Sequence, residues 1–229
     1  MNMMARLRPL FSLALSLAMP LLGAAALTAS VGGCTQAYYS AMEKVGQHKR
    51  DILRGRIEAG REDQEEAQEQ FQTTYERFAE VAHYDGGDLE PIYNRLNDEF
   101  ERSEARAADV SERIESIERV AADLFTEWED EIQLLNKPSY RANSERSLRE
   151  TKGRYGQLIS AMKRAESKMP PVLDAFRDQV LYLKHSLNAQ AVAALEGTLV
   201  EIESDVASLI SDIDVSIQEA ENFLSQLDG

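Results

Sequence analysis

The stretch LNDEFERSEARAADVSERIESIERVAADLFTEWEDEIQLL, residues 96–135, decides the fold. Apolar or small side chains recur along it at steps that mostly alternate between four and three residues: Leu96, Phe100, Ser103, Ala107, Val110, Ile114, Ile117, Ala121, Leu124, Trp128, Ile132 and Leu135. This spacing puts them on one face of a helix, with charged residues on the other faces. The pattern predicts a long helix with a sustained heptad seam that packs against other helices.

Turn sequences divide the chain on either side of this helix. Residues 85–88 (Asp-Gly-Gly-Asp) and residues 136–139 (Asn-Lys-Pro-Ser) are typical of turns. Residues 169–171 contain two prolines, which predict a kink or a restart because proline lacks a backbone donor and restricts the residue before it. A turn near Asn188 is an open alternative, since the seam spacing runs straight through that position.

These breaks predict an all-α fold of long antiparallel helices. The first helix covers about residues 37–84, although residues 58–70 in its centre are almost wholly polar. The seam resumes after residue 139 and continues to residue 227. Two arrangements satisfy this pattern: an elongated coiled-coil hairpin, if the helix is continuous through Asn188, or a four-helix bundle, if the chain turns there.

Charge is unevenly distributed along the chain. With 25 basic and 40 acidic residues the formal charge is −15, which argues against nucleic acid as a partner. Residues 139–168 have a net charge of +5, whereas residues 185–229 contain no Lys or Arg and have a net charge of −9. Because charges beside a heptad seam select the partner helix, we expect these two segments to pack together. The alternative is that both faces are simply solvated.

The N-terminus has the layout of a secretory signal. A basic segment (residues 1–8) precedes an apolar segment (residues 10–22), and small residues follow up to Val31-Gly32-Gly33-Cys34. This ending resembles the lipobox of bacterial lipoproteins, in which the cysteine is lipidated and becomes the new N-terminus. We therefore predict a signal peptide over residues 1–33 and a single helical domain over residues 34–229. An ordinary signal cut near residues 24–29 and an uncleaved membrane helix are the alternatives.

The predicted anchor places the protein in the cell envelope. Thr35 follows the cysteine, and by resemblance to Gram-negative lipoproteins the absence of Asp there indicates the outer membrane, with the body in the periplasm. A basic cluster follows the anchor and would contact anionic head groups, or would form an ordinary helical face. The cluster consists of Lys44, Lys49, Arg50, Arg54 and Arg56.

No sequence motif indicates catalysis, a cofactor or a metal. The chain lacks a Gly-rich phosphate loop and an HExxH pair, and its three histidines lie far apart. The one cysteine, Cys34, is assigned to lipid. We therefore expect no catalytic, cofactor-binding or metal-binding residues, and a chain that is not an enzyme.

Three stretches carry a family resemblance: residues 38–46, residues 49–53 and residues 175–191. They resemble a bacterial family of uncharacterised all-helical, coiled-coil-like envelope lipoproteins, classed as a domain of unknown function. The resemblance implies the architecture but no activity. The leading hypothesis is a structural or adaptor lipoprotein that binds a protein partner, or a second copy, through its heptad seam. The alternative is a periplasmic module that binds a lipid or a small ligand in a cavity near Pro170.

Overall fold

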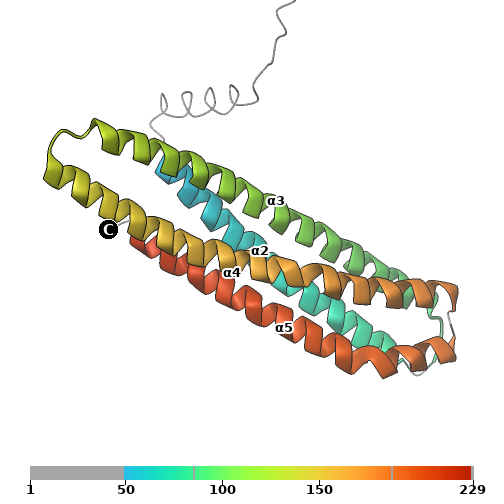
Figure 1. Ribbon diagram of the computed structural model, residues 1–229. Coiled ribbons are helices and arrows are strands. Elements are labelled where there is room, and N and C mark those ends of the chain that lie inside the picture. Colours follow the sequence, from blue (N-terminus) through green and yellow to red (C-terminus); the bar gives the residue numbers. More distant parts are fainter. Residues whose placement is uncertain (1–48, 85, 187, 228–229) are drawn as a thin grey trace, which may run out of the picture. The chain divides into compact units, whose positions relative to one another are not determined.

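The computed structural model describes residues 49–84, 86–186 and 188–227. The helices in this part of the chain are α2 (Lys49–Ala82), α3 (Glu90–Leu134), α4 (Pro138–His185) and α5 (Ala189–Leu227). Each helix packs against the next and α5 packs against α2, so the helices close a ring (Figure 1). Short turns reverse the chain between them, which makes an up-down-up-down bundle. The predicted all-α fold of long antiparallel helices is confirmed.

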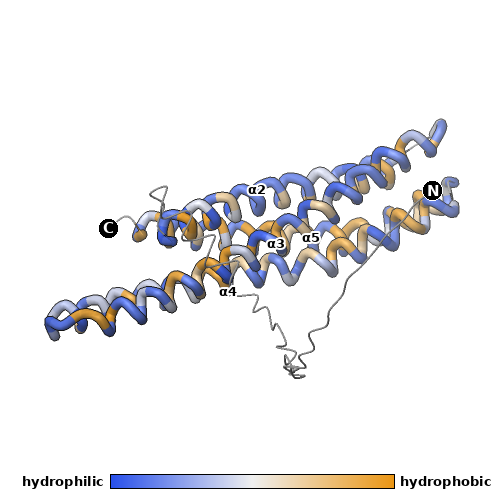
Figure 2. Tube along the Cα trace, turned by 90° about the horizontal axis from the view of Figure 1, so that it is seen from above, coloured by the Kyte–Doolittle hydropathy of each residue, from blue (hydrophilic) through white to orange (hydrophobic). Residues whose placement is uncertain are grey.

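The predicted seam forms the buried face of α3. Nine of its twelve residues are buried, and Ala107 and Trp128 are half-buried against the same core. The buried faces of α4 and α5 pack into this core as well. Figure 2 shows that α2 is the most hydrophilic of the four helices, in line with its polar central sequence. The seam is therefore buried by helices of the same chain.

Asn188 decides between the hairpin and the bundle. Helix α4 ends at His185, and α5 begins directly after Asn188. The Asn188 side-chain oxygen accepts hydrogen bonds from the backbone N–H of Gln190 at 3.0 Å and of Ala191 at 3.1 Å. Asparagine is a preferred residue for capping the N-terminus of a helix in this way. The chain turns here, and the bundle is the correct alternative.

The restart expected at residues 169–171 does not occur. Helix α4 continues through Pro170 and Pro171, both of which are exposed. The carbonyls of Glu166 and Ser167, which lose their intrahelical donors, lie on this outer side of the helix, where water can satisfy them. On the inner side, Met169 is only 1% exposed, so the apolar face is uninterrupted.

The basic part of α4 and the acidic α5 pack side by side, as the charge pattern predicts. Lys168 of α4 lies 2.6 Å from Asp212 of α5. Other basic residues of α4 pair with α3 instead, and Lys163 lies 2.5 Å from Glu118. Exposed ion pairs contribute only about 0.2–1 kcal/mol each. The apolar core therefore provides most of the stability, and the charges of α4 are shared between both neighbouring helices.

The polar centre of α2 reaches the core through a narrow face of Gly60, Gln64 and Ala67. A Cβ atom at Gly60 would lie 2.9 Å from the Ile117 Cδ1 atom, so the helices approach closely here. Gln64 is fully buried, and within the described part of the chain neither its amide oxygen nor its amide nitrogen has a hydrogen-bond partner. The buried Ser216 hydroxyl of α5 is also without a partner in the described part of the chain. Because burying a polar group without a hydrogen bond is unfavourable, the unpaired polar atoms of Gln64 and Ser216 lower the free energy of unfolding.

Gln64→Leu is expected to raise the free energy of unfolding by about 1–3 kcal/mol, because it removes an unpaired amide while nearly conserving volume. Urea unfolding followed by circular dichroism measures the change. Gln68→Leu is the matched control, since Gln68 lies one turn away and donates a hydrogen bond to Asp214 at 2.9 Å. A loss of stability in Gln64→Leu would show that the amide is satisfied in solution.

Candidate functional site

The predicted basic cluster is partly engaged within the bundle. Cys34 and Lys44 lie outside the described residues. The Lys49 side chain, 10% exposed, lies 3.1 Å from a carboxylate oxygen of Glu127 on α3. The Arg50 guanidinium lies over the Trp128 ring, 5.4 Å from its centroid. Lys49 and Arg50 therefore help to dock the start of α2 on α3.

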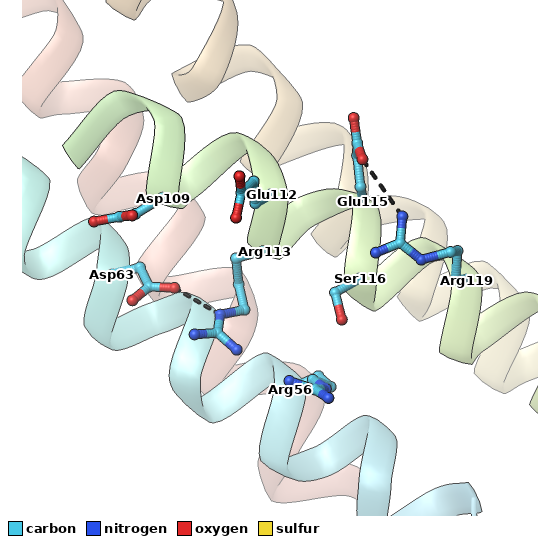
Figure 3. Close-up of a pocket in the computed structure, with 8 residues that line it drawn as sticks. All are labelled: Arg56, Asp63, Asp109, Glu112, Arg113, Glu115, Ser116 and Arg119. Carbon is cyan, nitrogen blue, oxygen red and sulfur yellow. Dashed lines mark hydrogen bonds and ion pairs between the residues drawn. The ribbon is translucent and has the colours of Figure 1, made fainter. Parts of the chain in front are cut away.

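The other two described members of the cluster point elsewhere. Arg54 is half-buried and takes part in contacts of its own. Arg56 lines a groove between α2 and α3 (Figure 3). The described cluster is thus spread around the first turns of α2 and does not form a single basic surface.

The groove beside Arg56 has a volume of about 670 Å³ and a strongly charged lining. Its residues are Arg56, Asp63, Asp109, Glu112, Arg113, Glu115, Ser116 and Arg119. Figure 3 shows Arg113 of α3 reaching toward Asp63 of α2, to which its Nε atom donates at 2.6 Å. Arg119 and Glu115 pair along α3 at 3.4 Å. Opposite charges paired in this way are typical of the contact between two surface helices.

A second polar cluster joins α2 to α3 closer to the other end of the bundle. The buried hydroxyls of Thr74 and Ser103 lie 2.8 Å apart, and Thr74 also donates to the backbone carbonyl of Glu99. The Glu99 carboxylate accepts from Gln70 at 2.9 Å and pairs with Arg102 at 2.7 Å. Partial burial alone would raise the pKa of Glu99, but the hydrogen bonds from Gln70 and Arg102 outweigh it and lower that pKa.

The lowered pKa of Glu99 makes this contact sensitive to acid. The carboxylate stabilises the fold above its ordinary pKa of 4.5, and the contribution is lost as the pH falls through the lowered value. Glu99→Gln should therefore lose less stability than the wild type over this acidic range, measured by urea unfolding at stepped pH. Glu62→Gln, at an exposed position of α2, is the control. Wild-type and Glu99→Gln curves with the same pH slope would contradict this assignment.

A cleft lies at the end of the bundle where α2 begins and α5 ends. Its volume is about 570 Å³, and residues of all four described helices line it, including Arg50, Trp128, Thr151 and Leu227. The Trp128 indole N–H donates to the Ser144 hydroxyl at 2.9 Å, which fixes the ring at the cleft wall. This cleft combines apolar and polar lining, unlike the charged groove.

The turn between α3 and α4 forms an exposed surface that we call the basic tip, residues 133–149. Leu134 and Tyr140 are 77% and 58% exposed. The Lys137 ammonium lies over the Tyr140 ring, 4.3 Å from its centroid, and the Arg141 guanidinium donates to the backbone carbonyl of Leu135 at 2.9 Å. The sequence predicts a turn at residues 136–139 and a basic segment after it, but not the exposure of Leu134 and Tyr140 at this end of the bundle. The sequence features that could have indicated an exposed surface here are the apolar residues that flank the turn and the basic residues that follow it.

Other features of a site are absent from the described residues. No group of three or more His, Cys, Asp or Glu side chains in residues 49–84, 86–186 and 188–227 is placed to hold a metal ion. Among these helices, none has an apolar stretch long enough to cross a membrane. The described chain thus defines a class of protein, an antiparallel four-helix bundle with a charged groove, an end cleft and a basic tip.

The chain belongs to the family described as "Protein of unknown function (DUF2959)", whose family model matches residues 38–227. The match confirms the resemblance to an uncharacterised family, and that description names no activity. No curated protein and no solved structure matches the chain.

Proposed function

We propose that the chain is a non-enzymatic lipoprotein of the cell envelope, anchored through Cys34 in the outer membrane with its bundle in the periplasm. The observation that carries the proposal is the order of a basic segment, an apolar segment and Val31-Gly32-Gly33-Cys34, with the one cysteine of the chain at the end. Several acyl chains on one residue would give stable attachment, whereas a single chain gives marginal binding.

In this proposal the bundle is a structural or adaptor element that binds a protein partner or a second copy. Nine of the twelve seam residues are buried between helices of the same chain. A partner would therefore contact the outer helix faces, which include Val200 on the acidic α5, 75% exposed. In this proposal the partner-binding surface is the outer helix faces and not the heptad seam.

A second candidate function is the binding of a small ligand in the end cleft. A volume of about 570 Å³, with Trp128 and Leu124 beside polar groups, suits a small molecule. The cavity expected near Pro170 does not support this function, because Met169, Val172 and Leu173 next to the prolines are packed in the core.

Envelope fractionation combined with in-cell crosslinking tests the leading proposal. We expect the chain to sediment with the outer membrane, to be released by detergent but not by high salt, and to crosslink into discrete larger species. Recovery in the soluble fraction would contradict the anchor. A chain that stays monomeric after crosslinking and co-purifies with a small molecule would favour the second candidate.

A further inference from the structure

The basic tip projects beyond the other two helices of the described bundle (Figure 1). The described part of α2 begins at the level of Glu127, to which Lys49 is paired. Helix α5 ends at Leu227, which lines the end cleft together with Ser147 of α4. Among the described helices, the end of α3 and the start of α4 therefore pair only with each other at the tip.

The chemistry of the tip differs from the rest of the molecule. Its charged residues are four exposed basic side chains and one acidic side chain: Lys137, Arg141, Arg146, Arg149 and Glu145. The tip thus has a net charge of +3 on a chain of net charge −15. It also exposes Leu134 and Tyr140, two of the most exposed large apolar residues in the described chain.

The tip is presented in an ordered form. The Lys137–Tyr140 contact and the hydrogen bond from Arg141 to the Leu135 carbonyl hold the turn, so the apolar and basic side chains project from a fixed backbone. One side of the tip forms an open groove of about 440 Å³, lined by Gln133, Glu145, Leu148 and Arg149 together with Glu129, Asp130 and Ile132. Leu134 and Tyr140 do not line this groove, and their exposed side chains can press against a broad surface.

An anionic lipid surface has the complementary chemistry. Lys and Arg side chains near such a surface are attracted by its negative potential. Tyrosine rings favour the level of the head groups, and a neighbouring leucine can enter the apolar boundary. Basic, aromatic and aliphatic side chains are combined at the tip in this way, whereas the exposed residues of α5 include many acids and no base.

We propose that the basic tip docks on the anionic surface of the membrane to which the chain is anchored. This inference rests on the proposed lipid anchor on Cys34. Fourteen residues lie between Cys34 and Lys49, so the fully extended chain from Cys34 to Lys49 spans at most about 54 Å. Lys49 lies at the tip end of the bundle, whereas the other end of α2, 34 residues along, is about 51 Å away. A lipid on Cys34 would therefore hold the tip end of the bundle closer to the membrane than the far end, which favours membrane contact by the tip.

The test uses the full chain, purified from the membranes of producing cells and reconstituted into vesicles of phosphatidylethanolamine and brominated phosphatidylglycerol. Trp128 is the one tryptophan of the chain, so Trp128→Phe provides a background without tryptophan emission. In that background Tyr140→Trp places a reporter at the tip. Tyr182→Trp places a matched reporter near the far end of α4, where Tyr182 is 43% exposed.

We expect the emission of the Tyr140→Trp variant to be quenched several-fold more strongly than that of the Tyr182→Trp variant. Adding Lys137→Glu and Arg141→Glu should remove most of the difference, as should high salt, because both weaken attraction to anionic lipid. Equal quenching of the two reporters would overturn tip docking, and so would a tip-to-tip crosslink between two copies.

The anchor is assessed separately on the same samples by intact mass. An unmodified Cys34 would overturn the proposed function, and quenching by vesicles added to that chain would still report on the tip. An acylated Cys34 without quenching at the tip would overturn this inference alone.

Discussion

Phe176→Ala is expected to lower the free energy of unfolding by about 3–5 kcal/mol, the range for removing a large buried aromatic ring. Phe176 of α4 is fully buried, and its ring stacks on Phe71 and Phe78 of α2 with centroid distances of 6.2 and 4.9 Å. Helices α2 and α4 are not neighbours in the ring of helices, so these three rings fill the centre of the bundle. Alanine at position 176 would leave a cavity at the centre of the bundle, and a shift of one helix alone would not fill it.

Urea unfolding followed by circular dichroism measures the effect, with Leu181→Ala as the matched control on the same helix. Leu181 is 47% exposed, so its truncation should change stability by no more than about 0.5 kcal/mol. Equal losses in the two variants would contradict the placement of Phe176 at the centre of the core.

Cys34→Ala is expected to deplete the membrane-bound mature chain by at least about a hundredfold, since each buried methylene of an acyl chain contributes ~0.8 kcal/mol to membrane binding. The proposed lipidation requires the thiol, and Cys34 is the one cysteine of the sequence. Immunoblotting of membrane and soluble fractions measures the mature chain and any larger precursor.

Thr35→Ala is the control for Cys34→Ala, because it changes the adjacent residue and keeps the thiol. It should leave the amount of membrane-bound mature chain unchanged. Cys34→Ala behaving like Thr35→Ala and like the wild type would contradict the lipid anchor. A soluble mature chain in all three would then favour the ordinary secretory signal, and a membrane-bound chain in all three would favour the uncleaved membrane helix.

The sequence predicts the fold correctly wherever the regular spacing of apolar residues determines it. The spacing from Leu96 to Leu135 predicts the buried face of α3, because a helix repeats its faces over the heptad. The turn at Asn188 was left open, since capping by an asparagine side chain is a local event that does not interrupt the apolar spacing. Pro170 and Pro171 predict a restart of the helix that the structure does not show. Their effect on a helix depends on whether they face solvent, which the local sequence does not specify.

Less of the candidate sites could be predicted from the sequence. The sequence leaves the basic cluster open between a contact with head groups and an ordinary helical face, because the partners of Lys49 and Arg50, Glu127 and Trp128, lie almost 80 residues away in sequence. The buried Gln64 was also missed, because a glutamine within a polar stretch gives no sign of facing the core. The basic tip depends on where α2 and α5 end relative to the α3–α4 turn, which is a property of the assembled bundle.

The central claim, a bundle attached to a membrane through lipid on Cys34, is tested most directly by mass spectrometry of the N-terminal peptide of the mature chain. We expect this peptide to begin at Cys34 and to carry the added mass of acyl chains. A mature chain that begins near residues 24–29 with an unmodified Cys34 would contradict the anchor and, with it, the proposed place of the protein in the envelope.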